Sequence, residues 1–406
     1  MKEGTAMSEK EKKVGFVTMG EVQAPTQEVP SLGIGMIGYA FMGKAHTNAY
    51  IDMPFFFYPP PARPKLVAIA GRTRDKVAEA ARRYGYQKYY TDWMELVKDK
   101  DVQLVDIGTP NDEHHDQAIA AVENGKNVLC EKPLARTAKE AREMLDAAER
   151  AKVRHMVAFN YRFVPAIVQA KRLIQRGTIG KLLQFRAVYL QEWIMDPNFP
   201  LVWRMRKDIA GSGALGDLGA HVLDLARYLM GDITDVSGLT RTFIDERPLP
   251  EDPAKKGKVD VDDAFMALLK FQNGAIGSVE ASRFAAGRKN FQRLEIHGTE
   301  GSINFNLERL NELELYVRSD PPDSLGFRDI SITEAVHPFW DRWWPHGHII
   351  GWEHTFIHEV HHLIDCIVNK KDVSPEGASF YDGWKVNLIM DKILESATTG
   401  KWASVQ

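Results

Sequence analysis

Apolar runs alternate with amphipathic segments between residues 31 and 159. The first run, Leu32 to Gly38, ends in a glycine turn, and a segment of small side chains follows it, as a helix follows a strand. The same order repeats, with strands expected at 65–70, 102–107, 127–130 and 155–159 and helices at 74–84, 116–124 and 138–151. Strands that alternate with helices predict a parallel sheet, because right-handed crossovers place helices over both of its faces.

The pattern changes from about Lys181 onward. Segments of alternating apolar and polar residues follow one another at short intervals and are joined by turn residues such as Asn273-Gly274. This order is typical of antiparallel strand pairing. A loop rich in Pro, Lys and Asp is expected at 245–261, and amphipathic helices at 352–368 and 381–396 close the chain.

These patterns divide the chain into an extension and two domains. Residues 1–30 are expected to be a poorly ordered extension. Residues 31–155 are expected to form a doubly wound α/β domain, and residues 156–406 an α+β domain. The predicted fold class is therefore α/β, with a doubly wound parallel sheet followed by an α+β domain whose sheet is mostly antiparallel.

The composition narrows the classes of partner. The 406 residues carry 52 Lys and Arg against 55 Asp and Glu, a formal net charge of −3, so no basic surplus favours nucleic acid or an acidic membrane. The two cysteines, Cys130 and Cys366, cannot form a disulfide framework. No apolar stretch approaches the roughly 18 residues of a membrane span, and the charged first residues do not resemble a signal peptide. We therefore expect a cytoplasmic protein.

The first candidate site is the glycine turn after the first strand. A dinucleotide needs a tight turn, a close approach of the backbone and helix N–H groups directed at the pyrophosphate. Ala40 replaces the middle glycine of the usual fingerprint, so the motif is degenerate. Its position between a strand and a helix still predicts nucleotide binding, by Gly38, Ala40, Phe41, Met42 and Gly43.

The turn after the second strand, Gly71-Arg72-Thr73-Arg74, bears on the choice of cofactor. An NAD site usually has an acid here that binds the ribose 2′-hydroxyl, whereas a 2′-phosphate needs guanidinium and hydroxyl donors. The turn contains no acid. We expect NAD or NADP as cofactor, with NADP slightly favoured.

Two further motifs carry groups suited to proton transfer. Lys132, in Glu131-Lys132-Pro133, follows a strand, where ligands bind in open α/β sheets. Asp217 and His221 are four residues apart at the start of a helix and share one face of it. A carboxylate can orient an imidazole that titrates near neutral pH, but a capping Asp beside a packed His would give the same spacing.

A metal motif and several tryptophans allow other interpretations. His358, Glu359 and His362 match HExxH, a zinc-protease pattern. A solvated or interface helix is the simpler interpretation, because these side chains lie beside or opposite the apolar face, and we expect no metal. Indoles in loop-like segments can stack on sugars, fill interfaces or pack in a core; they are Trp193, Trp203, Trp340, Trp343 and Trp344.

The motifs GYAFMGKAH, TPNDEHH, CEKPLA, NYRF and GSGALGDLGAHVLDLARYL occur in this order. In this respect the chain resembles the glucose–fructose oxidoreductase and inositol dehydrogenase (Gfo/Idh/MocA) family over about residues 31–400. The resemblance implies that residues 31–155 are a Rossmann domain that binds NAD(P). It also implies that residues 156–406 bind substrate and form homo-oligomers, often through the exposed face of an open sheet. It assigns catalysis to Lys132, Asp217 and His221. It also implies a nicotinamide side lined by Thr109, Pro110, Asn111 and His114, and places Asn160, Tyr161 and Arg162 near the active site. We further expect Glu131 and Lys132 to bind the cofactor and Trp193 to contact the substrate.

The hypothesis that follows is a dehydrogenase that oxidises a secondary hydroxyl of a cyclic sugar by hydride transfer to nicotinamide. His221 is the first choice of base, because its unperturbed pKa of about 6.5 lies near working pH, and Lys132 is the alternative. The resemblance implies a 3-keto sugar as product. An inositol dehydrogenase, a catalytically silent nucleotide-binding regulator and a zinc hydrolase remain alternatives.

Overall fold

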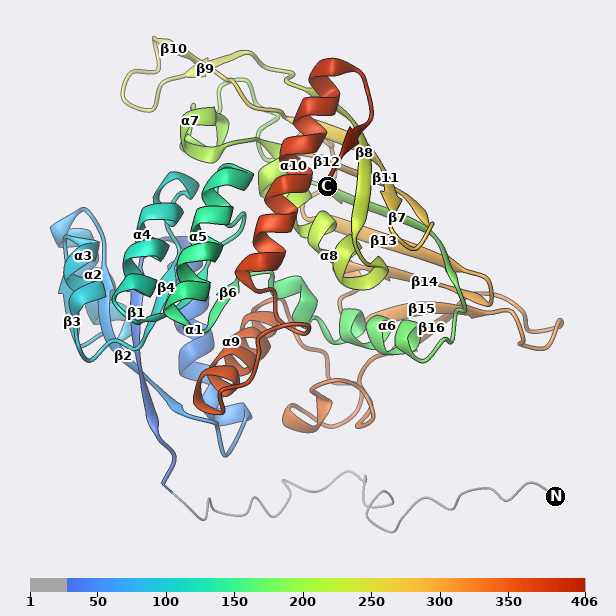
Figure 1. Ribbon diagram of the computed structural model, residues 1–406, viewed down its shortest axis with the longest axis horizontal. Coiled ribbons are helices and arrows are strands. Elements are labelled where there is room, and N and C mark those ends of the chain that lie inside the picture. Colours follow the sequence, from blue (N-terminus) through green and yellow to red (C-terminus); the bar gives the residue numbers. More distant parts are fainter. Residues whose placement is uncertain (1–27, 406) are drawn as a thin grey trace.

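The computed structural model describes residues 28–405 (Figure 1). The predicted extension, residues 1–30, lies outside this range except for its last three residues, which are not in a helix or strand. Among the described residues, no helix combines the length and the apolar character that a membrane span requires.

A six-stranded parallel sheet forms the centre of the first domain, in the order β3-β2-β1-β4-β5-β6. This confirms the predicted parallel sheet. Apolar side chains of the inner strands, such as Ile34 and Ile69, are fully buried, as the continuous apolar runs require. The strands are β1 (Ser31–Ile37), β2 (Arg63–Ala70), β3 (Lys88–Tyr90), β4 (Leu104–Ile107), β5 (Asn127–Cys130) and β6 (His155–Val157).

Five helices connect these strands. Two of them have the predicted bounds, α2 (Arg74–Tyr84) and α5 (Ala138–Ala151); the others are α1 (Phe41–Phe56), α3 (Trp93–Lys98) and α4 (Asn111–Glu123). The start predicted for α4, Asp116, is wrong, because the helix begins at Asn111. Asp112 and Glu113 stand in its first turn, where acidic side chains stabilise the positive end of the helix.

The second domain is built on a nine-stranded sheet, in the order β16-β15-β14-β13-β7-β12-β11-β8-β17. Among the described strand pairs of this second sheet, only β7–β12 is parallel, so the sheet is mostly antiparallel, as predicted. Its strands are β7 (Leu182–Leu190), β8 (Ile233–Arg241), β11 (Ala264–Phe271), β12 (Ile276–Ser282), β13 (Phe291–Gly298), β14 (Gly301–Asn306), β15 (Glu312–Val317), β16 (Arg328–Ser331) and β17 (Ala403–Ser404).

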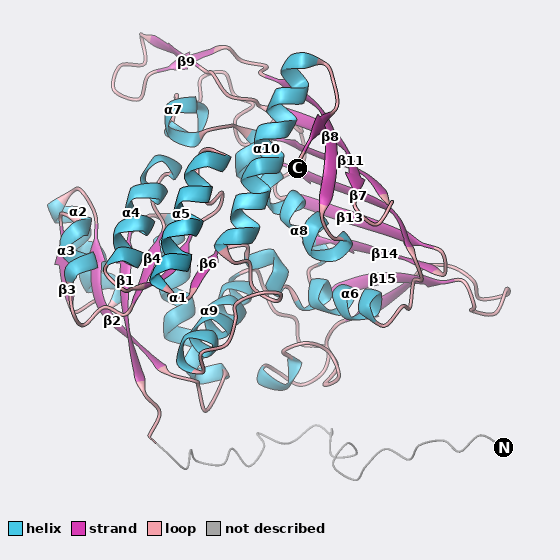
Figure 2. Ribbon diagram, in the orientation of Figure 1, coloured by secondary structure: helices cyan, strands magenta, loops and turns pink. Residues whose placement is uncertain are grey.

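Helices cover the side of this sheet that faces the first domain (Figure 2). They are α6 (Pro165–Gln175), α8 (Ala220–Met230) and α10 (Phe380–Thr399). The opposite side carries exposed apolar side chains, including Leu239, Met266 and Leu268. The loop predicted at 245–261 contains a short antiparallel pair, β9 (Glu246–Pro248) and β10 (Lys256–Lys258). Each strand has only three residues, too few for an alternating apolar and polar pattern to be recognised.

The carboxyl-terminal helices connect the two domains. Helix α9 (Glu353–Val368) packs on α1, and α10 packs between α5 and β8. The end of the chain therefore returns to the first domain, and the division predicted at residue 155 stays a prediction.

Candidate active site

A cavity of about 680 Å³ lies where the carboxyl ends of β4 and β5 and the start of α1 meet the second domain. This is the edge at which parallel α/β sheets bind ligands. Both domains contribute to its wall. From the first domain come Ala40, Phe41, Met42, Thr109, Pro110, Asn111, Glu131 and Lys132, and from the rest of the chain come Asn160, Tyr161, Tyr189, Gln191, Trp193, Trp203, Arg204, Asp217, His221, Lys289 and Asn290.

The glycine turn at the start of α1 fits a dinucleotide pyrophosphate. Gly38 has a φ of 101°, and a Cβ there would lie 2.7 Å from the Gly108 carbonyl oxygen, so only glycine suits this position. A Cβ on Gly43 would lie 2.1 Å from the Gly38 oxygen. No side chain of the described structure caps α1 at Ala40, and its first turn contains no acid. The helix N–H groups at the cavity are thus available to a phosphate.

The turn from Gly71 to Arg74 lies beside the glycine turn but outside the cavity wall. The Gly38 N–H donates to the Ala70 oxygen over 2.9 Å, which joins the two turns. The ring of Tyr39 covers Gly71 so closely that a Cβ there would lie 2.1 Å from it. Arg72, Thr73 and Arg74 are exposed. Their donors are open to solvent at the end of β2.

Lys132 and Asp217 connect the two domains across the cavity. Lys132 follows β5, and its Nζ donates to the Asp217 carbonyl oxygen over 2.7 Å and lies 3.3 Å from Asp217 Oδ1. The Lys132–Pro133 peptide bond is cis. Burial alone would raise the pKa of Asp217, but nearby cations outweigh this effect and lower it to about 2. These cations are Lys132, Arg204 and Arg283. Asp217 is therefore ionised.

His221 lies in the first turn of α8, with its ring 4.6 Å from that of Tyr161. Burial, and then the charge of Lys132, lower its pKa well below 6.5, while Asp217 acts in the opposite direction. The expectation that this imidazole titrates near neutral pH is therefore wrong, because the sequence does not reveal how deeply it is buried. His221 is neutral, and its Nδ1 has no hydrogen-bond partner among residues 28–405.

A wall of hydroxyl and amide groups lies next to this histidine. The hydroxyls of Tyr161 and Tyr189 are 2.8 Å apart, and Tyr189 donates to Asn290 Oδ1 over 2.8 Å. Gln191 Nε2 donates to the same oxygen over 2.6 Å. The sequence patterns did not indicate Tyr189, Gln191 and Asn290 as site residues. Their only signal was that Tyr189 and Gln191 alternate with apolar residues where β7 ends.

Three residues of the expected nicotinamide side, Thr109, Pro110 and Asn111, line the cavity, but His114 does not. Its Nδ1 lies 3.1 Å from the Pro133 oxygen and its Nε2 lies 3.0 Å from the Thr109 oxygen. Since α4 begins at Asn111, His114 points beneath the loops after β4 and β5. It supports the cavity wall without forming part of it.

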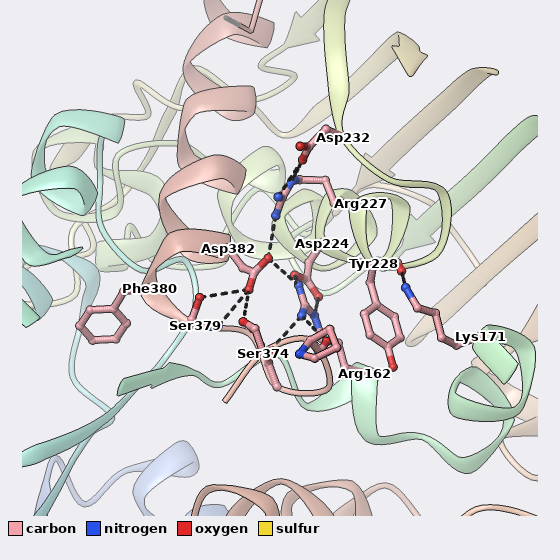
Figure 3. A network of polar contacts seen from close by, with 12 residues as sticks. Arg162, Lys171, Asp224, Arg227, Tyr228, Asp232, Ser374, Ser379, Phe380 and Asp382 are labelled. Carbon is pink, nitrogen blue, oxygen red and sulfur yellow. Dashed lines mark hydrogen bonds and ion pairs between the residues drawn. The ribbon is translucent and has the colours of Figure 1, made fainter. Parts of the chain in front are cut away.

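Arg162 was expected to contact substrate, and its position corrects this expectation. Its Nε and Nη2 donate to the Asp224 carboxylate over 2.8 and 2.6 Å, and Nη2 lies 3.4 Å from Asp382 Oδ1 (Figure 3). The neighbouring Asn160 and Tyr161 do line the cavity. The three residues lie in a tight 3-10 turn, Asn160–Phe163, whose successive side chains point in different directions.

The HExxH motif does not form a metal site in the described residues, which contain no group of three or more His, Cys, Asp or Glu that could hold an ion. His358 Nε2 accepts from Trp343 Nε1 over 2.7 Å, and His362 Nε2 lies 2.8 Å from the Val373 oxygen. His358 and Glu359 are fully buried. Of the two alternatives expected here, a solvated or an interface helix, the solvated one is wrong, because α9 packs on α1.

The loop tryptophans have different surroundings. Trp193 and Trp203 line the cavity, which agrees with the expectation for Trp193. Trp340 is buried and Trp343 packs against His358, whereas Trp344 is 43% exposed.

Comparisons with known proteins agree with this geometry. Residues 32–159 match the model of the oxidoreductase family with an NAD-binding Rossmann fold, and residues 167–304 match the C-terminal domain of the GFO/IDH/MocA family. Levoglucosan dehydrogenase of Pseudarthrobacter phenanthrenivorans is 48% identical over 387 residues, which cover 92% of this chain and 98% of that protein. The scyllo-inositol 2-dehydrogenase (NAD(+)) of Bacillus subtilis is 33% identical, over 67% of this chain and 71% of that protein.

The fold is also similar to a solved structure of levoglucosan dehydrogenase in complex with NADH and levoglucosan. The TM-score is 0.89 at 49% sequence identity, and the similarity covers 93% of this chain and 99% of that chain.

Proposed function

This chain belongs to the GFO/IDH/MocA family of NAD-binding oxidoreductases, and from that premise we propose that it oxidises one secondary hydroxyl of a pyranose sugar such as levoglucosan. One observation carries the proposal. Lys132 of the first domain and the pair Asp217 and His221 of the second meet at one cavity, beside the helix N-terminus that suits a dinucleotide.

His221 accepts the proton of the reacting hydroxyl. Its lowered pKa keeps the ring neutral, so a nitrogen lone pair is available at working pH. The ionised Asp217 compensates for the positive charge that develops on the ring. Lys132 donates a hydrogen bond to the same hydroxyl oxygen and stabilises the negative charge that develops there.

The bound dinucleotide supplies the hydride acceptor. The chain supplies the alignment: Lys132 and His221 hold the oxygen, while Tyr161, Tyr189 and Asn290 offer donors and acceptors to neighbouring hydroxyls. The indoles of Trp193 and Trp203 can pack against the apolar face of a sugar ring. The proposed product is a 3-keto sugar, as the resemblance to the family implied.

The choice of dinucleotide is the finer part of the proposal. Exposed Arg72 and Arg74 provide guanidinium groups for a 2′-phosphate, and Tyr39 occupies the space in which a side chain at position 71 would lie. We propose that the enzyme accepts NADP as well as NAD.

Initial rates on levoglucosan, glucose, methyl glucosides and myo- and scyllo-inositol, each with NAD and NADP, test the proposal. We expect kcat/KM to be highest for a pyranose, with measurable turnover on both dinucleotides. The similarity to an inositol dehydrogenase makes the inositols the relevant alternative. An inositol preferred over every pyranose would assign that activity instead, and tight dinucleotide binding without turnover would indicate a regulator.

A further inference from the structure

A buried histidine behind the cavity lies between two carboxylates. His46, on α1, has its Nδ1 2.9 and 3.0 Å from the two carboxylate oxygens of Asp106, and its Nε2 3.1 Å from Glu131 Oε1. His46 and Asp106 are fully buried. Tyr50 also donates to Asp106, over 2.8 Å. The three residues Asp106, His46 and Glu131, here called the buried triad, form one chain of contacts that ends at the cavity wall.

The geometry of the triad suits an imidazolium. Each ring nitrogen faces a carboxylate, and only the protonated ring can donate from both nitrogens. Burial alone would lower the pKa of His46, but Asp106 and Glu131 outweigh it and raise this pKa well above 6.5. Burial likewise opposes ionisation of Glu131, but the hydrogen bond and charge of His46 lower its pKa.

The other buried titratable groups that surround the triad are neutral. Burial raises the pKa values of Glu359 on α9, Cys130 on β5 and Tyr50 on α1, and lowers that of His114 on α4, so each is uncharged near neutral pH. Both carboxyl oxygens of Glu359 are buried without a hydrogen-bond partner in the part of the chain described. His46 therefore contributes most to the ionisation of Glu131, and the nearby Lys132 adds to it.

Glu131 connects the buried triad to the cavity. Its side chain is part of the wall, together with Thr109 and Pro110, and its Oε2 accepts the backbone N–H of Lys132 over 3.0 Å. An anion in a site largely shielded from water stabilises a nearby cation much more strongly than it would in bulk solvent. Oxidised nicotinamide is a cation, whereas reduced nicotinamide is neutral.

We propose that His46 is a positioning residue that keeps Glu131 ionised at the cavity wall, and that the Glu131 charge makes the site bind oxidised dinucleotide more tightly relative to reduced dinucleotide. This inference rests on the proposed function, since it places the nicotinamide near Lys132 and Glu131. His46 lies in the GKAHTNAY segment and has no role in the mechanism proposed above, so the inference gives this residue a function.

Loss of His46 changes the protonation of Glu131. Without the imidazolium, the negative charge of Asp106 is no longer compensated, and its repulsion raises the pKa of the buried Glu131. Glu131 then takes up a proton as the pH falls through the neutral range. The preference for oxidised dinucleotide becomes dependent on pH, whereas in the wild type Glu131 stays ionised and the preference stays constant.

Dissociation constants for NAD⁺ and NADH, measured by calorimetry on the full-length protein at about pH 6 and about pH 8, test this. The ratio of the NADH constant to the NAD⁺ constant should be the same at both pH values in the wild type. In Glu131→Gln it should fall about tenfold at both. In His46→Gln it should fall at the lower pH and recover at the higher, and Tyr50→Phe, which removes only the outer contact of Asp106, should match the wild type.

Each contrary result overturns a definite part of the inference. An unchanged ratio in Glu131→Gln would show that the carboxylate does not set the preference, whether or not His46→Gln folds. The role of His46 would be refuted if the ratio of the two dissociation constants were lower at about pH 6 than at about pH 8 in the wild type. It would also be refuted if folded His46→Gln showed the same ratio at both pH values. A wild type that binds neither dinucleotide would instead refute the proposed function itself.

Discussion

Lys132 and His221 come from different domains, and Lys132 changes what His221 can do. The charge of Lys132 helps to lower the pKa of His221 and so keeps the imidazole neutral. Asp217 accepts a hydrogen bond from the Lys132 ammonium, whose charge also helps to keep the Asp217 carboxylate ionised. The sequence predicted these residue types and their convergence. It did not predict the protonation state of His221, because that depends on the rings of Phe159, Tyr161 and Tyr189, which bury it.

The pH dependence of kcat/KM for oxidation follows from this environment. A base with a lowered pKa stays neutral as the pH falls through 6.5 and loses its function only at lower pH. We therefore expect the acid limb of the profile to lie below pH 6.5. Lys132→Met removes one cause of the lowering, so the acid limb of its residual activity should move to higher pH. An acid limb at or above pH 6.5 in the wild type would contradict the assignment of His221 as base.

At the scale of elements, the strongly periodic segments were predictable and the irregular ones were not. The bounds of α2 and α5 follow directly from their sequence, because an amphipathic pattern and clear end signals coincide there. The start of α4 was missed, because Asn111 to His115 is polar and resembles a loop. The burial of His358 and Glu359 was missed because it depends on α1, a helix about 300 residues away in sequence, which no local pattern reveals.

Arg162 is the clearest case of a motif residue whose role is structural. It joins the turn that carries Tyr161 to Asp224, which lies one turn after His221 on α8 (Figure 3). Asp382 and Arg227 extend the same network to α10. The network therefore fixes the position of the turn that carries Tyr161 relative to α8, which carries His221.

Removal of one partner from this network should destabilise the fold. Arg162→Met leaves Asp224 as an uncompensated buried carboxylate, and we expect a loss of about 3–5 kcal/mol in the free energy of unfolding. Arg150→Met, at an exposed arginine of α5, is the matched control and should stay within about 0.5 kcal/mol. Urea denaturation followed by circular dichroism measures both. Equal stabilities of the two variants would show that the network contributes little.

On the scale of the whole molecule, the outer face of the large sheet is not covered by any other part of residues 28–405. Leu239, Met266, Leu268 and Ile276 lie on neighbouring strands β8, β11 and β12, and each is more than half exposed. An apolar face of this kind is usually an interface. We propose that it joins two copies of this chain into a homo-oligomer, as the resemblance to the family implied.

A charge placed at the centre of this face should dissociate the oligomer. In Leu268→Lys, an ammonium group would be buried at the proposed interface without a partner, so the mass in solution should fall to that of a smaller species. Val336→Lys, at an exposed apolar residue of a distant loop, should keep the wild-type mass. Light scattering coupled to size-exclusion chromatography distinguishes the two. A monomeric wild type would exclude the proposed interface.

The most direct test of the central claim is the turnover number for levoglucosan oxidation in Lys132→Met and His221→Ala, measured beside Lys139→Met, at an exposed lysine of α5. If Lys132 and His221 act on one hydroxyl, each of the first two substitutions lowers kcat by about a hundredfold or more. Dinucleotide affinity stays within a few-fold of wild type, and Lys139→Met keeps full activity. Rates in Lys132→Met and His221→Ala close to those of the control would contradict the account.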